Sequence, residues 1–203
     1  MKNAKNLRIV TIVLAVALAI CSVAMVYVSA STVIPGGEET DYIKVVSKNA
    51  SYKAKTELLY AVEVDEASLG MGNSDTVYML FWNSAQTGSN AYTFETASYR
   101  VYNKYKETQG EHAGRYIFAS DGINACDISK TIYARPAVKF VDFVDGELKV
   151  SYKYGELVEY SVADYANEML SKDNIDEKHV KLYNALLTYG EEAKKLADKL
   201  LGQ

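Results

Sequence analysis

Between about residues 41 and 160, short apolar stretches with strand signals are separated by polar turns, and this pattern predicts a β-rich domain. The stretches lie at 54–64, 76–82, 92–102, 115–119, 131–144 and 148–160. They are separated by clusters of turn-forming residues at 70–74, 83–90, 121–122 and 145–146. Several short strands at this spacing indicate an antiparallel β-sandwich, or a strongly bent antiparallel sheet.

The pair Asp145–Gly146 gives the most specific of these turn signals. It lies between an apolar run at 140–144 and a second run that begins at 148 and alternates through Tyr152 and Tyr154. Asp-Gly readily adopts the two positive φ angles of a type I′ turn, which joins antiparallel strands in register. The sequence therefore predicts a β-hairpin centred on these two residues.

The pattern changes after residue 160 to the three- and four-residue spacing of helices. Ser161 and Asp164 fit a capping box, with Asp in place of Glu, and predict a helix that runs to about residue 171. A polar turn follows at 172–176, with Asp176 as a candidate cap for a second helix that ends near residue 201. We therefore expect a mainly β fold with C-terminal α structure: a sandwich-like domain at 41–160 and a helical hairpin packed on it at 161–203.

The second helix carries one apolar line at helical spacing, formed by Leu182, Leu186, Tyr189, Ala193, Leu196 and Leu200. Such a line is typical of an amphipathic helix, whose apolar face is buried against another surface. We expect it to pack on the sheet or on the other helix. A surface that recruits a partner helix is the alternative.

The first thirty residues have the properties of a targeting or anchoring segment. Positions 9–37 contain no charged residue, and three cationic residues precede them: Lys2, Lys5 and Arg8. Glu38, Glu39 and Asp41 follow. Basic residues before an apolar segment and acidic residues after it predict an amino terminus inside the cell and the remainder outside. Residues 31–40, which include Pro-Gly-Gly, are expected to be a linker.

The sequence alone does not decide whether this segment is cleaved off or retained. Val28-Ser-Ala30 fits a signal-peptidase site, so cleavage after Ala30 is the favoured outcome. The apolar part at 9–28 is also about long enough to remain as a single membrane anchor. Lipidation of Cys21 is disfavoured, because the bulky Ile20 precedes it. The protein is expected to be extracellular or at the cell surface.

Charge excludes one class of partner. The whole chain has 22 basic and 26 acidic residues, and its formal net charge is -4. Without the three cationic residues of the leader, 19 basic residues remain against 26 acidic ones, a net charge near -7. Nucleic-acid binding depends on basic contacts to phosphate, so it is not expected. Membrane contact is expected only through the N-terminal segment, because no basic patch would attract anionic lipid.

Tyrosine is unusually frequent, with 17 residues against 5 Phe and 1 Trp. This frequency indicates either half-exposed β-sheet or an aromatic surface that faces a ligand. The single Trp82 alternates with Tyr78 and Leu80 on one face of a predicted strand. Trp82 is interpreted as a core residue or, with Tyr78, as a candidate sugar-stacking platform.

No motif in the sequence carries a recognised chemistry. His112 and His179 are isolated and expected to be solvated, and Cys126 is expected to be a small buried side chain. The Gly70-Met-Gly72 segment precedes a strand and is read as a loop, and 173–177 lacks the glycine and spacing of a calcium-binding loop. We therefore predict no catalytic residue, no metal site and no cofactor.

Four motifs stand in order within residues 114–197: Ile132-Tyr-Ala-Arg-Pro136, Asp145-Gly146, Tyr160-Ser-Val-Ala-Asp-Tyr-Ala166 and Leu182-Tyr-Asn-Ala-Leu-Leu-Thr-Tyr-Gly190. Through these motifs, residues 114–197 resemble a module of large exported proteins of gut clostridia and their relatives. This resemblance implies a β-sandwich-like unit with trailing helices in a Gram-positive extracellular setting. It implies no catalytic residue.

The sequence thus favours a non-catalytic exported module of the cell envelope or medium, with a structural or binding role. The expected partner is an envelope glycan or a protein, and the oligomeric state is open. A carbohydrate-binding protein is the first alternative. An extracellular hydrolase with acidic catalysts is the second, although the sequence alone does not select a pair of carboxylates.

Overall fold

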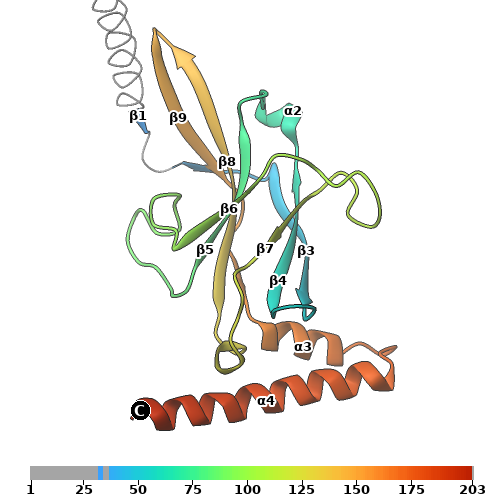
Figure 1. Ribbon diagram of the computed structural model, residues 1–203. Coiled ribbons are helices and arrows are strands. Elements are labelled where there is room, and N and C mark those ends of the chain that lie inside the picture. Colours follow the sequence, from blue (N-terminus) through green and yellow to red (C-terminus); the bar gives the residue numbers. More distant parts are fainter. Residues whose placement is uncertain (1–31, 34–36, 203) are drawn as a thin grey trace, which may run out of the picture. The chain divides into compact units, whose positions relative to one another are not determined.

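The computed structural model of the protein describes residues 32–33 and 37–202 (Figure 1). The chain divides into two compact units: Met1–Pro35 with Val141–Ser151, and Gly36–Phe140 with Tyr152–Gln203. The predicted leader, with Ala30 and Cys21, lies outside the described residues. Within the described residues, no helix is both long and apolar enough to span a bilayer.

The larger unit contains the part of one β-sheet that lies outside residues 141–151, and the whole of a second sheet. In the first, strands follow the order β9-β8-β5-β6, with β10 paired to β8 and β2 paired to β9. Their bounds are β2 Glu38–Glu39, β5 Thr76–Trp82, β6 Tyr99–Asn103, β8 Ile132–Val144, β9 Glu147–Tyr154 and β10 Val158–Tyr160. The second sheet has the order β3-β4-β7, with bounds Ile43–Ser51, Glu57–Val64 and Tyr116–Ala119. β10 and β5 pair antiparallel with β8, as do β5 with β6 and the strands of the second sheet, whereas β2 is parallel to β9.

One core lies between these sheets. Because side chains alternate along a strand, every second residue of β4, β5 and β8 faces inward. The core includes Leu58, Tyr60, Val62, Val77, Met79, Phe81, Phe118, Ala134 and Val138. Val162 and Ala166 of the first C-terminal helix belong to the same cluster. The fold is therefore mainly β, sandwich-like, with C-terminal helices that contribute to its core, as the sequence predicts.

The other face of the first sheet is also covered, by the segment from Asn83 to Ser98, here called the 83–98 loop. Two rings of this loop, Tyr92 and Phe94, contact rings on the sheet. Arg135 of β8 donates to the carbonyls of Tyr92 and Gly155, at 3.2 and 2.8 Å. Residues 92–98 were expected to be a strand, and the structure corrects this: their aromatic side chains pack on the sheet, and pairing begins only at Tyr99.

The helices begin where the sequence predicts. α3 spans Val162–Leu170, and Ser161 and Asp164 form both hydrogen bonds of the capping box. α4 spans Glu177–Leu201, and the Asp176 side chain accepts hydrogen bonds from the backbone N–H groups of Lys178 and His179. Two short helical elements, α2 at Glu66–Leu69 and η1 at Ala125–Asp127, complete the unit. Figure 1 shows α3 and α4 side by side, and Tyr165 and Tyr183 make an edge-to-face ring contact between them.

The face of α4 that packs on the domain differs from the predicted one. Its buried residues are Tyr183 and Gly190, and Gly190 lies against Ile128, just after η1. In contrast, Leu182 and Tyr189 of the predicted apolar line are 48% and 64% exposed. The helical hairpin packs on itself and on the domain as expected, and Leu186 of this line packs against the core, but most of the line stays exposed. Because Gly190 has no side chain, α4 approaches η1 through the neighbouring stripe instead.

In the smaller unit, the predicted hairpin turn is present. Asp145 and Gly146 have φ angles of 56° and 82°, the two positive values of a type I′ turn. Strand β1, Thr32–Val33, pairs in parallel with Lys149 and Val150 of β9. Residues 31–40, expected to be a linker, thus contain the two short strands β1 and β2. Strand β3 has no counterpart among the predicted strands.

Candidate functional site

The structure places the two candidate ligand-binding aromatics differently. Trp82 is fully buried under the 83–98 loop, where its indole N–H donates to Thr96 Oγ1 at 3.2 Å and Tyr92 packs edge-on against its ring. Tyr78 is half-buried between Phe94 and Tyr102. In this structure Trp82 is a core residue, so it offers no ring face to a sugar.

The other residues singled out in the sequence are dispersed. His179 is exposed and forms an ion pair with Asp176, whose pKa is lowered by hydrogen bonds from the backbone and side chain of His179. His112 is half-buried with its Nδ1 atom enclosed, so it is not the solvated side chain expected. Cys126 is free and half-buried rather than buried. The described residues hold no group of three or more His, Cys, Asp or Glu side chains arranged for a metal ion.

A pocket of about 220 Å³ lies where the first sheet meets the segment that leads into and out of η1. We call it the Asn83–Lys130 pocket. It draws on three separate regions: the residue after β5, the start of β6, and the connection from β7 to β8. Its lining residues are Asn83, Tyr99, Asp121, Gly122, Ile123, Asn124, Asp127, Lys130 and Ile132.

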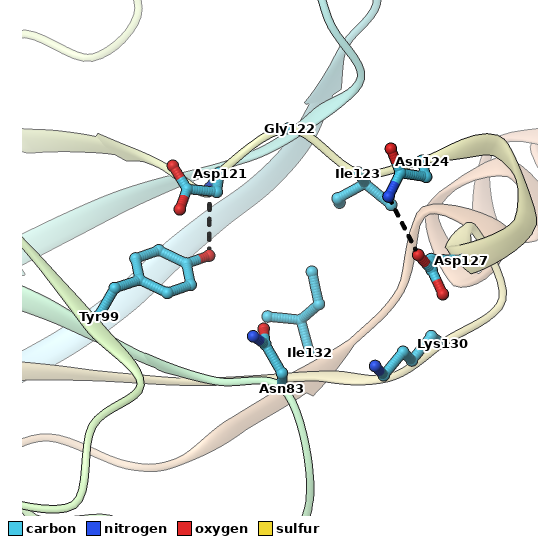
Figure 2. Close-up of a pocket in the computed structure, with 9 residues that line it drawn as sticks. All are labelled: Asn83, Tyr99, Asp121, Gly122, Ile123, Asn124, Asp127, Lys130 and Ile132. Atoms are coloured by element: carbon cyan, nitrogen blue, oxygen red, sulfur yellow. Dashed lines mark hydrogen bonds between the residues drawn. The ribbon is translucent and has the colours of Figure 1, made fainter.

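The side chains of this pocket are arranged around an apolar floor. Figure 2 shows Asn83, Tyr99 and Lys130 directed toward one space, beside Ile123 and Ile132. Asp121, Asn124 and Asp127 add carboxylate and amide groups at its edge, and Asn124 Nδ2 donates to Asp127 Oδ2 at 3.4 Å. The pocket therefore offers ammonium, amide and hydroxyl donors together with carboxylate acceptors.

Tyr99 links the pocket to the core. Its hydroxyl oxygen accepts a hydrogen bond from the backbone N–H of Asp121 at 3.1 Å, while its ring stacks on Phe81 at 4.7 Å. Burial raises the pKa of Tyr99 to about 12. At neutral pH the phenol is therefore protonated and can donate its O–H to a ligand.

The segment that carries Asp121 to Asn124 is held to the second sheet. Ser120 N–H donates to the carbonyl of Leu58 at 2.8 Å, and Ser120 Oγ accepts from Leu58 N–H at 2.9 Å. Ile123 N–H donates to the carbonyl of Thr56 at 2.8 Å. These long-range bonds fix the backbone of one wall, so a ligand would meet a largely preformed surface.

A second hollow, of about 720 Å³, lies over the turn between α3 and α4. All of its lining comes from the continuous stretch 165–183. Because the Asn83–Lys130 pocket brings together residues from three distant regions over a hydrogen-bonded frame, it is the better candidate for a specific ligand.

No signal in the sequence pointed to this pocket. Asn83 and Asp121 stand in stretches that the residue pattern predicts only as turns, and it predicts no helix at η1. The lining residues are separated by up to 49 positions, and no motif connects them. Only the pairing of β5 with β6 and β8 brings Asn83, Tyr99 and Ile132 together.

Comparison of the chain with protein-family models gives no match, and comparison with curated proteins gives none either. The case for a function therefore rests on the sequence and on the site.

Proposed function

We propose that the protein is an exported, non-catalytic binding module, and that its ligand is a sugar unit of an envelope glycan held in the Asn83–Lys130 pocket. The observation that carries this proposal is the convergence of Asn83, Tyr99 and Lys130 over the apolar floor of Ile123 and Ile132. A sugar ring has the matching chemistry, because it combines apolar C–H patches with hydroxyl groups that both donate and accept hydrogen bonds.

The size of the pocket limits what it can hold. Pockets for drug-sized ligands usually enclose about 300 to 1,000 Å³, and this one encloses about 220 Å³. It suits one terminal unit of a longer molecule rather than an extended chain. A small contact area predicts modest affinity for a single unit, which repetition along a glycan surface would increase through multivalency.

The proposed extracellular setting has its own support. An uncharged apolar segment at 9–28 with basic residues before it and acidic residues after it favours export. The resemblance of residues 114–197 to modules of exported clostridial proteins favours the same setting. The acidic mature chain would be repelled by anionic envelope polymers, so neutral or amino sugars are the favoured ligands within this proposal.

The test is binding of the exported full chain to an array of bacterial envelope glycans, followed by titration calorimetry with the best fragment. The double variant Asn83→Ala, Lys130→Ala removes two exposed polar groups of the pocket. We expect its affinity to fall at least about tenfold, since each lost hydrogen bond contributes roughly 0.5–1.5 kcal/mol, or more for a charged donor.

The matched control is Asn90→Ala, Lys104→Ala, which removes the same two side-chain types at exposed positions outside the pocket. Its affinity should equal that of the unchanged protein. Equal loss in both double variants, or no loss in either, would reject the pocket as the binding site. Release of reducing sugar that depends on Asp121 or Asp127 would overturn the non-catalytic part and favour the hydrolase.

A further inference from the structure

The end of the β8–β9 hairpin, residues 142–148, carries exposed apolar side chains and is here called the hairpin tip. Every residue of the tip is exposed, and Phe143, Val144 and Leu148 are 67%, 39% and 39% exposed. None of the three belongs to the core cluster. Three large apolar side chains gathered at one exposed turn are a candidate interaction surface.

The hairpin tip has two different faces. Its turn, Asp145–Gly146, contains two residues, so Phe143 stands opposite Leu148 on the neighbouring strand. Because side chains alternate along a strand, these two residues share one face. The other face carries Asp142, Val144, Glu147 and Lys149. An element with one apolar and one mainly charged face suits a boundary between water and an apolar phase.

Strand β1 connects the N-terminal segment to this same hairpin. Thr32 and Val33 pair in parallel with Lys149 and Val150 of β9. In a parallel pair, the chain enters β1 at the end where β9 also begins, and β9 begins at the hairpin turn. At about 3.3 Å per residue, the turn lies roughly 10 Å along β9 from Lys149. The chain therefore enters this unit from the side of the hairpin tip.

The apolar part of the N-terminal segment ends close to β1 in the sequence. It covers residues 9–28, about the length that crosses the hydrocarbon core of a bilayer, and only residues 29–31 separate it from Thr32. The stretch from Val28 to Thr32 spans at most about 14 Å. If residues 9–28 cross a membrane, the outer boundary of its hydrocarbon core therefore lies within about this distance of β1. The hairpin turn lies at a comparable distance from β1.

We propose that residues 9–28 are retained as a membrane anchor and that the hairpin tip lies on the outer surface of the same bilayer, with Phe143 and Leu148 in the lipid interface. The partner is lipid because the anchor itself brings the bilayer to the tip. The contact uses apolar side chains, so it requires no basic patch, and the charged face stays toward water. The sequence alone favours cleavage after Ala30, but after cleavage nothing in the chain would bring a bilayer to these residues.

The first experiment determines the fate of the N-terminal segment in cells that export the protein. Mass spectrometry of the chain from the membrane fraction should show that residues 9–28 are still present. The protein should leave this fraction only with detergent. A chain that begins at Ser31 and is free in the medium would overturn the proposal.

The second experiment measures the depth of the hairpin tip in the full chain, reconstituted in vesicles of phosphatidylcholine and phosphatidylglycerol. An environment-sensitive fluorophore is attached at Leu148→Cys in a Cys21→Ser, Cys126→Ser background. It should lie about 5–10 Å into the boundary between headgroups and acyl chains, and spin-labelled lipids should quench it. The control is Asp142→Cys, on the charged face of the same hairpin, where we expect loss of most of this quenching.

A further variant separates insertion from mere proximity to the bilayer. With the fluorophore at Leu148→Cys, the exchange Phe143→Asp should remove most of the quenching, because a charged side chain is costly to bury in lipid. Phe143 is largely exposed, so circular dichroism should show an unchanged fold. Tyr102→Asp, at a residue that is 65% exposed outside the tip, is the control and should leave the quenching unchanged.

Equal quenching at the two labelled positions, or quenching that Phe143→Asp leaves unchanged, would show that the tip does not insert. Either result would overturn the proposal even for a retained anchor. Neither result bears on the glycan pocket, because no labelled or exchanged position lines that pocket.

Discussion

Trp82 illustrates how the role of a side chain depends on what covers it. On the strand it alternates with Tyr78 and Leu80, a pattern equally suited to a core or to an exposed platform. The 83–98 loop decides between these roles. Tyr92 packs against the ring of Trp82, and Thr96 accepts a hydrogen bond from its N–H group. The same loop buries Tyr152 and Tyr154, whose rings form a stacked contact. Part of the unusual tyrosine content thus fills a second packed layer.

Truncation of Trp82 should therefore destabilise the protein. We expect Trp82→Ala to lower the free energy of unfolding by about 3–5 kcal/mol, the usual loss for a large buried aromatic residue. Urea unfolding followed by far-UV circular dichroism measures this change. Tyr102→Ala is the control, since Tyr102 is 65% exposed, and it should change stability by no more than about 0.5 kcal/mol. A loss below about 1 kcal/mol for Trp82→Ala would contradict the burial described here.

The helix and turn signals of the sequence are local, and these signals gave correct predictions. Ser161 and Asp164 satisfy each other's backbone N–H groups at 3.0 and 2.9 Å, so α3 begins at Val162. Asp176 caps the start of α4 by accepting hydrogen bonds from the backbone N–H groups of Lys178 and His179. Such caps depend on a few neighbouring residues and not on the rest of the fold.

Loss of the α3 cap should have a measurable cost. Ser161→Ala removes the acceptor for Asp164 N–H and leaves this partly buried donor without its capping partner. We expect the free energy of unfolding to fall by about 1 kcal/mol, and by no more than about 2 kcal/mol. Ser171→Ala, at the exposed C-terminal end of the same helix, is the control and should change stability much less. Equal effects at both ends would show that the capping box contributes nothing specific.

The assembly of the larger unit depends on a close approach at Gly155. Gly155 N–H donates to the carbonyl of Pro136 at 2.9 Å, and its own carbonyl accepts from Arg135 Nε. A Cβ atom at this position would lie 2.3 Å from the carbonyl oxygen of Ile43 in the second sheet. Only a residue without a side chain allows the two backbones to come this close.

Substitution of Gly155 should strain the meeting of the two sheets. Because the obstructing atom belongs to the backbone, Gly155→Ala must displace strand β3 or the end of β9. We expect a loss of at least about 2 kcal/mol in the free energy of unfolding, at the level of overpacking in a core. Chemical denaturation measures it. In the control Gly72→Ala, the new Cβ would have only Asp75 Oδ2 nearby, at 3.8 Å, and stability should stay nearly constant. Unchanged stability of Gly155→Ala would show that β3 can move freely.

The sequence by itself determined the fold class, the hairpin at Asp145–Gly146, both helix starts and strand β5 at its exact bounds. These features follow from alternation, turn geometry and caps, which act between residues a few positions apart. Residues 92–98 show where such local signals fail, because the alternating aromatic residues there form no strand.

Only the tertiary structure decided which surfaces are covered. α4 has two neighbouring apolar stripes: the one with Gly190 packs against Ile128, whereas Leu182, Tyr189, Leu196 and Leu200 of the other stay exposed. The Asn83–Lys130 pocket likewise exists because sheet pairing joins residues that are distant in sequence. A residue pattern shows that an element has an apolar face. The competition between surfaces for burial, which involves the whole chain, selects the partner of that face.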